Sequence, residues 1–366
     1  MVASYGWSGG SGVLVRKPLP QNQKSGQSRV DLANAPFPLM KTKPALVSAL
    51  ILLFLPGFLI ADHRLGIWNI EKLSTRELRG FPELKGANSL QPRTDVELDQ
   101  IAAYIEDTLN VDALVVTEID ADDTESGTAF KPRSVQLTHI AEAMGSQWKY
   151  LLGRSGGDLR IGFVYNSDRI GLKRIVELPA PEFEVQGDDV FDRDPLLLWI
   201  TLKKENGDDG ADILLVGLHL KSGQDYKHNH LAAVAKLVGD LKTPAVREGL
   251  GLPRTQSGEN DLIVLGDLND SSHDDNGFRF IFTYLESQGF RHMGSTLNPY
   301  PETRVNGSQI DHMFLSADIF NDAYVLESFA VHGVPDTEAA RRDYRQVFSD
   351  HFPLTIDLRS IEDDDD

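Results

Sequence analysis

Short apolar runs alternate with amphipathic segments from about residue 62 to residue 358. Eight of the runs are rich in Val, Ile and Leu and are bounded by Gly, Asp or Asn, a pattern that predicts β-strands. The expected strands are 64–70, 112–119, 160–166, 195–202, 212–220, 261–268, 309–316 and 352–358. Three other segments have apolar residues at helical spacing and are expected to be helices, namely 95–109, 228–241 and 278–288.

The order of these elements predicts the fold class. Strands are numerous and helices stand between only some of them, which favours an α/β protein with two packed sheets and helices outside them over a simple doubly wound sheet. Thr94 is expected to cap the helix 95–109. Neither an internal repeat nor a long linker interrupts residues 62–358, so we predict one domain there, followed by an acidic, solvated tail at 359–366.

The N-terminal part has a different pattern. Residues 40–61 carry two lysines near their start, continue as an apolar stretch and end on Ala61 before a polar residue, which is typical of a secretory signal peptide. An uncleaved membrane segment is the alternative, although the apolar run is slightly short for one. Residues 1–39 are then a disordered extension or a misassigned start, with Met40 as the initiator. We therefore expect a secreted or periplasmic protein, anchored to the membrane only if residues 40–61 are retained.

Charge and composition limit the kinds of binding surface and metal site that the chain can form. The chain has 366 residues, 41% of them hydrophobic, and a formal net charge of −19 at pH 7. This charge argues against a broad basic face for nucleic acid, but not against an enzyme that meets phosphate locally through a metal. There is no cysteine, which excludes disulfides, thiolate nucleophiles and cysteine-based zinc sites. A metal site must use His, Asp, Glu and Asn, and oxygen-rich ligands favour Mg²⁺, Mn²⁺ or Ca²⁺.

Polar side chains gather where the expected strands end. The apolar run 262–265 stops at Gly266, and Asp267 and Asn269 follow at once. Taken alone, such residues are usually turn residues. Strand ends in layered α/β proteins project from one edge of a sheet, however, so residues from several strands converge there in hydrolytic metal sites. The residues at such positions are Asn69, Glu71, Glu118, His219, Asp267, Asn269, Asp311, Asp350 and His351.

Six segments carry a resemblance to a known family: WNIE, VTEI, GLHLKSG, VLGDLND, QIDHMFLS and SDHFP. Their order and approximate spacing resemble those of the endonuclease/exonuclease/phosphatase family, which includes deoxyribonuclease I, abasic-site endonucleases, inositol polyphosphate 5-phosphatases and bacterial sphingomyelinases. The resemblance covers residues 64–358 and is greatest to bacterial secreted nucleases. It implies a four-layer α/β sandwich, in which two packed mixed β-sheets are flanked by helices.

The resemblance also implies roles for the polar residues. It places four of them at the metal: Asn69, Glu71, Glu118 and Asp350. It gives catalytic roles to His219, Asp267, Asn269, Asp311 and His351. Arg160 and Lys221 are the expected substrate contacts. The implied cofactor is Mg²⁺ or Mn²⁺, with Ca²⁺ as a further alternative.

The implied catalytic roles differ from residue to residue. Asp267 and Asn269 would position the attacking water and hold the phosphate, and His219 would contact a phosphate oxygen. His351 would contact the scissile phosphate or act as general base, while Asp311 accepts its other N–H and so fixes its tautomer. Whether Asp267 or His351 takes the proton stays open.

These inferences together predict a divalent-metal-dependent phosphodiesterase, in the first place a secreted endonuclease that hydrolyses DNA or RNA. Three arginines in segment 341–346 would grip a nucleic-acid backbone, with a solvated helix or loop face as the alternative. Nucleic acid is therefore the expected partner, as substrate, and no stable protein partner is inferred. The alternatives are a lipid phosphodiesterase similar to sphingomyelinases, a phosphomonoesterase and, last, a catalytically inactive binding module.

Overall fold

The structure is a computed structural model of the chain. It describes residues 63–75, 78–79, 89–90, 92–122, 132–178, 184–185, 188–189, 191, 193–223, 227–252, 261–270, 280–297 and 300–359. The chain divides into two units, Met1–Pro56 and Gly57–Asp366, and every described residue belongs to the second. The expected signal segment 40–61 lies outside the described residues, so it stays a prediction, as do the domain boundaries. Within the described ranges, no helix is both long and apolar enough to cross a membrane.

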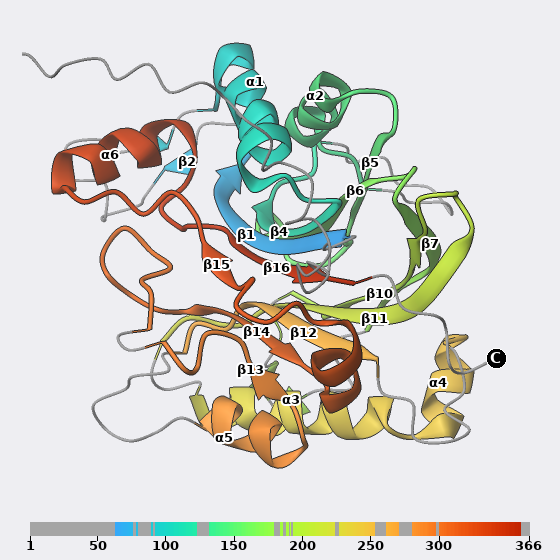
Figure 1. Ribbon diagram of the computed structural model, residues 1–366. Coiled ribbons are helices and arrows are strands. Elements are labelled where there is room, and N and C mark those ends of the chain that lie inside the picture. The colour runs from blue at the N-terminus through green and yellow to red at the C-terminus, as the bar shows by residue number, and fades with distance from the viewer. Residues whose placement is uncertain are drawn as a thin grey trace, which may run out of the picture. The chain divides into compact units, whose positions relative to one another are not determined.

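Two six-stranded sheets stack face to face (Figure 1). The first has the order β15 (Ala330–Val331), β16 (Leu354–Leu358), β1 (His63–Leu73), β4 (Ala113–Ile119), β6 (Arg160–Asn166) and β5 (Trp148–Leu152). The second has the order β13 (Arg291–His292), β14 (Asp311–Leu315), β12 (Leu262–Asp267), β11 (Asp209–His219), β10 (Leu196–Lys203) and β7 (Ile170–Glu177). Neighbouring strands are antiparallel except for the parallel pairs β1–β4 and β11–β12, so both sheets are mixed. Two short ribbons pair β2 (Leu78–Arg79) with β3 (Ser89–Leu90) and β8 (Glu184–Val185) with β9 (Asp188–Asp189).

Helices cover the outer face of each sheet. Figure 1 shows α1 (Asp95–Ala103) and α2 (Val135–Met144) on the first sheet, and α3 (Lys227–Leu241) and α5 (Phe280–Ser287) on the second. The π-helix η1 (Tyr104–Leu109) continues α1. Further helices are α4 (Pro244–Leu250), the π-helix η4 (Ile319–Ala323) and α6 (Glu338–Val347). The layer order of helix, sheet, sheet and helix confirms the expected four-layer α/β sandwich.

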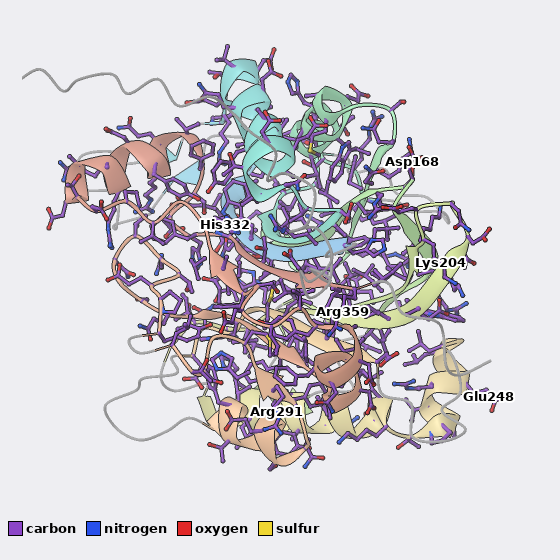
Figure 2. The ribbon with its side chains drawn as sticks, viewed as in Figure 1. Asp168, Lys204, Glu248, Arg291, His332 and Arg359 are labelled. Atoms are coloured by element: carbon purple, nitrogen blue, oxygen red, sulfur yellow. The ribbon has the colours of Figure 1, made fainter. Side chains whose placement is uncertain are left out.

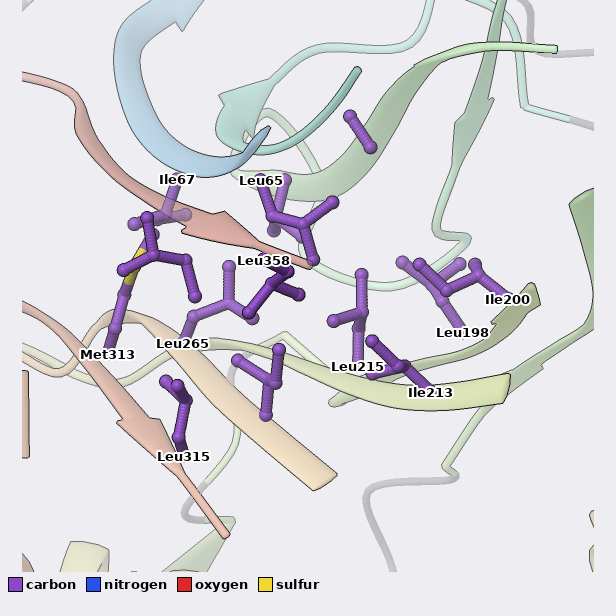
Figure 3. Close-up of a cluster of buried hydrophobic side chains, with 14 of the residues drawn as sticks. Leu65, Ile67, Leu198, Ile200, Ile213, Leu215, Leu265, Met313, Leu315 and Leu358 are labelled. Carbon is purple, nitrogen blue, oxygen red and sulfur yellow. The ribbon is translucent and has the colours of Figure 1, made fainter. Parts of the chain in front are cut away.

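Apolar side chains fill the space between the two sheets (Figure 3). Leu65 and Ile67 of β1 point into this space, because residues two apart in a strand share a face. Trp68 and Ile70 of the same strand belong instead to the cluster beneath α1 and α2. Both faces of β1 are therefore buried, which explains why apolar residues occupy both of its faces. Each fully buried side chain of this kind stabilises the fold by about 1.5–3 kcal/mol.

The start of α1 has the predicted cap. The Thr94 hydroxyl accepts a hydrogen bond from the backbone N–H of Glu97 at 3.3 Å, and the Glu97 carboxylate accepts one from the backbone N–H of Thr94 at 2.7 Å. This reciprocal pair satisfies two donors that a helix start otherwise leaves without intrahelical partners. The helix continues through η1 and ends at Asn110, which is left-handed at φ 48°. The predicted helix 95–109 is confirmed over its whole length.

His332 follows β15 at the edge of the first sheet and is labelled in Figure 2. Its Nε2 lies 2.7 Å from Thr355 Oγ1 on β16. Burial lowers the pKa of His332 below its ordinary value, Arg64 acts in the same direction, and Asp357 opposes them. The folded chain therefore favours the neutral imidazole at this position.

The two parallel pairs position the predicted site. A helical crossover joins each pair, through α1 and η1 in the first sheet and through α3 and α4 in the second. In open α/β sheets, ligands bind outside the carboxyl ends of such strands. β1 and β12 contact each other across the interface between the sheets. Their carboxyl ends meet in a hydrogen bond between Asn69 and Asp267.

Candidate active site

Three of the predicted residues stand in one row across the second sheet. His219 ends β11 and is the register partner of Asp267, the last residue of β12. Asp267 is in turn the register partner of Asp311, the first residue of β14. Register partners on neighbouring strands point to the same face of a sheet, so strand order brings together residues that are far apart in the sequence. All three are buried.

The turn after β12 requires its own residues. A Cβ on Gly266 (φ 154°) would lie 1.9 Å from the carbonyl oxygen of Leu218 on the neighbouring strand, so no larger residue fits there. Asn269 is left-handed at φ 48°, and its Nδ2 donates to Leu220 O at 2.8 Å. Its backbone N–H donates to Asp267 Oδ1 at 2.9 Å. The turn thus holds the Asp267 carboxylate in a fixed orientation.

The first sheet contributes Asn69 and Glu118. The Asn69 amide Nδ2 donates to Glu118 Oε1 at 3.1 Å and to Asp267 Oδ2 at 3.0 Å, so one side chain links carboxylates from both sheets. Glu71, Lys72 and Glu118 have positive φ angles of 48°, 55° and 66°. Such backbone conformations cost about 1–3 kcal/mol each in non-glycine residues and tend to cluster at functional sites.

The segment before β16 brings in His351. Ser349 Oγ donates to Asn69 O at 2.6 Å and accepts from the backbone N–H of His351 at 3.0 Å. Trp68 Nε1 donates to His351 O at 3.1 Å. These hydrogen bonds of Trp68 and Ser349 hold the segment SDH against the segment WNIE. They thereby bring His351 to the same edge of the sheets as Asn69.

His351 and Asp267 have strongly perturbed acidities. His351 Nδ1 lies 2.7 Å from Asp311 Oδ2, and its Nε2 lies 3.9 Å from Asp267 Oδ2 and 3.7 Å from Asp350 Oδ1. Burial lowers the pKa of His351, but the carboxylates of Asp311, Asp350 and Asp267 outweigh it and raise that pKa to about 10. Burial and then the Asp311 charge raise the pKa of Asp267 to about 7. The surrounding carboxylates thus favour the charged form of His351, whereas burial and Asp311 disfavour ionisation of Asp267.

The pKa of His219 is shifted in the opposite direction to that of His351. Its Nε2 lies 3.7 Å from Asp267 Oδ2 and 3.9 Å from Glu118 Oε1. Burial lowers the pKa of His219 well below its ordinary value, and positive neighbours that include Arg193 and Lys72 act in the same direction. The Asp267 carboxylate is therefore flanked by one neutral and one charged imidazole.

The residues at this centre fit a divalent cation. Asp267, Asp311 and His351 each have a potential ligand atom, and these atoms lie within 4.8 Å of one another. The two carboxylates can bind a cation directly, whereas the imidazole could do so only in its neutral form. Asp311 Oδ1 is buried and has no hydrogen-bond partner within the described part of the chain, a costly state that a ligand would relieve. Glu118, whose side chain is 17% exposed, adds a carboxylate that solvent reaches. This oxygen-rich donor set suits Mg²⁺ or Mn²⁺.

Two further predicted ligands are paired with arginines. Glu71 accepts from Arg345 Nε at 2.9 and 3.0 Å, and Arg345 also donates to Glu71 through a terminal nitrogen. Asp350 Oδ2 accepts from Arg304 at 2.8 and 2.5 Å and lies 3.8 Å from Arg345. Their roles as metal ligands stay predictions.

The predicted substrate contacts lie on the strand ends. Arg160 begins β6, donates to Gly157 O and lies 4.0 Å from Asp120 Oδ1. Lys221 is partly exposed two residues after His219. A role for either residue in substrate binding stays a prediction.

Several residues of the centre carry no signal in the sequence. Lys72 Nζ lies 3.9 Å from Glu118 Oε2. The positive charge of Arg193 helps to lower the pKa of His219. Arg93 donates to four backbone carbonyls, two at the end of β1 and two at the end of α6. A motif search misses them because their partners lie far away in the chain.

The arginines of segment 341–346 do not form a single outward face. Arg341 lies 2.5 Å from Glu302 Oε2, and Arg345 pairs with Glu71. Arg342 is exposed, 3.9 Å from Glu338 on the same helix. Two of the three are thus held by acidic partners elsewhere in the fold.

Comparison with known proteins supports the fold. No protein-family model matches the sequence, and no curated protein matches it. Three similar solved structures have TM-scores of 0.50 and cover 81% of this chain: the mannosyl-6-phosphatase of Bacteroides thetaiotaomicron (16% identity, 99% of its chain), the human Nocturnin catalytic domain (14%, 92%), and an endonuclease/exonuclease/phosphatase family protein from Bacteroides thetaiotaomicron (16%, 94%). The chain therefore has the fold of the endonuclease/exonuclease/phosphatase family, as its motifs predict. On this fold it carries a buried group of two aspartates and a histidine.

Proposed function

We propose that the protein is a divalent-metal-dependent phosphoester hydrolase. One observation carries the proposal: the carboxylate of Asp267 lies within 3.9 Å of His219 and His351 and is hydrogen-bonded to Asn69, which also binds Glu118. Five residues from five segments thus surround one point at the carboxyl ends of the parallel strands. That convergence is what phosphoester hydrolysis at a metal centre requires.

The residues have complementary chemical roles in this proposal. His351, held in its charged form by Asp311, donates from Nε2 to an oxygen of the phosphoryl group. Asp267, whose carboxylate lies between His219 and His351, accepts the proton of the attacking water. A bound divalent cation would supply positive charge to the non-bridging and leaving oxygens.

The proposed substrate is a phosphodiester of DNA or RNA. The resemblance of the motifs to secreted nucleases supports it, and so does the exposed Arg342 on α6. A phosphomonoester is the second candidate. The pairing of Arg341 and Arg345 with internal carboxylates favours it, because it reduces the charge available for a long polyanion. The similar fold of a protein named as a mannosyl-6-phosphatase points the same way.

One assay distinguishes these substrates. The purified full chain is incubated with supercoiled plasmid, RNA, sphingomyelin vesicles or a sugar phosphate, with Mg²⁺, Mn²⁺, Ca²⁺ or EDTA. We expect plasmid or RNA cleavage that EDTA abolishes, that His351→Ala reduces by about 10²-fold or more, and that the control Asp343→Asn, at an exposed position of α6, leaves within about threefold. Release of phosphate from the sugar phosphate alone selects the second candidate, and turnover of sphingomyelin alone selects a lipid substrate. No turnover of any substrate contradicts the proposal.

We further propose that the protein is exported. The support is the apolar segment 40–61 with its basic start, which is a feature of the sequence. N-terminal sequencing of protein recovered outside the cytoplasm tests this. A mature chain that begins near residue 62 agrees with export and cleavage, whereas one that retains Met1 contradicts cleavage.

A further inference from the structure

Glu71 and Asp350 form a second carboxylate pair beside the Asp267 centre. Glu71 lies on the strained end of β1, and Asp350 lies in the segment that precedes β16. Both are buried, at 7% and 3% exposure. The negative charge of Asp350, after burial itself, raises the pKa of Glu71, because two nearby negative charges repel. Both carboxylates can be charged in this buried position only if a positive group lies beside them.

The cations at this pair are arginines of the chain itself. Arg345 reaches Glu71 with both Nε and a terminal nitrogen, and the same terminal nitrogen lies 3.8 Å from Asp350 Oδ2. Arg304 donates two hydrogen bonds to that Asp350 oxygen. Two guanidinium charges thus stand against two carboxylate charges, and their hydrogen bonds occupy both oxygens of Glu71 and the Oδ2 oxygen of Asp350.

The packing of α6 fixes the position of Arg345. α6 packs its only buried residue within its described span, Tyr344, against Phe348 and Phe352, and this places the next residue over the end of β1. The side chain of Arg345 is 21% exposed, whereas that of Arg342 on the same helix is 69% exposed. Arg345 is therefore an internal partner of Glu71.

We propose that Arg345, together with Arg304, is the resident cation of the Glu71–Asp350 pair, so that these two carboxylates bind no metal and the chain holds a single divalent cation at the Asp267 side. The guanidinium groups also orient Asp350, whose other oxygen Oδ1 lies 3.7 Å from His351 Nε2. Arg345 is a positioning residue in this account, because it acts on the centre through the two carboxylates. The inference rests on the proposed function only in expecting a divalent cation at Asp267.

Metal binding without substrate tests this directly. The full chain is titrated with MnCl₂, and free Mn²⁺ is measured by electron paramagnetic resonance. We expect one Mn²⁺ per chain for the wild type and for the control Arg342→Met. For Arg345→Met we expect a second Mn²⁺, or an affinity that is about tenfold tighter or more, because a positive charge beside two carboxylates has been removed.

A second variant covers the case in which Arg345→Met does not fold. Glu71→Gln keeps the shape of the side chain and removes its charge, so we expect Mn²⁺ affinity within about threefold of the wild type. If Glu71 were a ligand, the affinity would instead fall by about tenfold or more. Two Mn²⁺ in the wild type, a tenfold loss in Glu71→Gln, or unchanged binding in folded Arg345→Met each overturns the inference. Cleavage that needs no metal contradicts the proposed function instead, so the two failures are distinguishable.

Discussion

Replacing Asp311 by asparagine removes the charge that keeps His351 protonated but leaves the shape of the side chain unchanged. The amide oxygen can still accept from His351 Nδ1, which lies 2.7 Å from Asp311 Oδ2 in the native protein. The ring is therefore expected to keep its position. The substitution changes the acidity of the imidazole, and it also removes a negative charge that a bound cation would feel, so the assay uses a saturating concentration of Mg²⁺.

The size of the change follows from the distance. Two unit charges about 4 Å apart interact by about 4 kcal/mol at the effective dielectric of a protein site. At about 1.4 kcal/mol per pKa unit, this is enough to bring the pKa of His351 from about 10 down into the neutral range. A smaller fraction of the enzyme then carries the charged imidazole, and the remaining charge is less well stabilised. We expect kcat to fall by about 10²–10⁴-fold, or about 2.7–5.4 kcal/mol.

The assay is the pH profile of kcat/KM on a chromogenic phosphodiester at a fixed, saturating concentration of Mg²⁺. His351 acts in its protonated form, so activity falls as the pH rises through its pKa. In Asp311→Asn that alkaline limb is expected to move to lower pH. Asp343→Asn, which changes an exposed carboxylate on α6, is the control. Activity within about threefold of the wild type, with an unmoved alkaline limb, would refute the reasoning.

Three further predictions concern stability and are measured by urea denaturation. Gly266→Ala forces a Cβ to 1.9 Å from Leu218 O, so we expect a loss of about 3 kcal/mol or more in the free energy of unfolding; a loss below about 1 kcal/mol contradicts that geometry. Thr94→Ala removes the cap of α1 and is expected to cost about 1 kcal/mol, whereas an unchanged midpoint would mean that the cap contributes nothing. The lowered pKa of His332 gives a stabilisation that is present above about pH 6.5 and lost as the pH falls through the lower folded pKa. His332→Gln should therefore lose less stability than the wild type between about pH 7.5 and pH 5, and an equal loss would show that this histidine does not contribute.

The sequence predicts the parts of the fold that depend on local pattern. The middle parts of β11 (213–218) and β12 (262–266) are apolar throughout because both faces of these strands are buried. Thr94 and Glu97 stand at the spacing of a capping box, and the structure forms one. Gly266 marks the close approach of two strands, although only the structure shows which carbonyl it approaches.

Other elements lack such a pattern. β7 (Ile170–Glu177) is an edge strand with three exposed residues in its middle, so no apolar run identifies it. α6 buries only Tyr344 among its described residues, so it lacks the wide apolar stripe that identifies the other helices in the sequence. These elements are stabilised by long-range contacts, which a local pattern does not contain.

The candidate site likewise contains some residues that the local sequence pattern predicts and others that depend on long-range packing. Strand-end residues such as Asp267 and His351 are predictable because their motifs place them after or before apolar runs. The pairing of Glu71 with Arg345 spans 274 residues and depends on how α6 packs on the end of β1. The acidities of His219 and His351 are likewise set by burial and by neighbours from other strands. The sequence alone does not show that one imidazole is neutral and the other charged.

Anomalous diffraction from crystals grown with Mn²⁺ tests the central claim, which is that scattered strand ends form one metal centre for phosphoester chemistry. We predict one peak at about 2.0–2.6 Å from a carboxylate oxygen of Asp267, with Glu118 or Asp311 as a further ligand. A peak coordinated only by residues outside this centre, or no peak at a saturating concentration, would contradict the account.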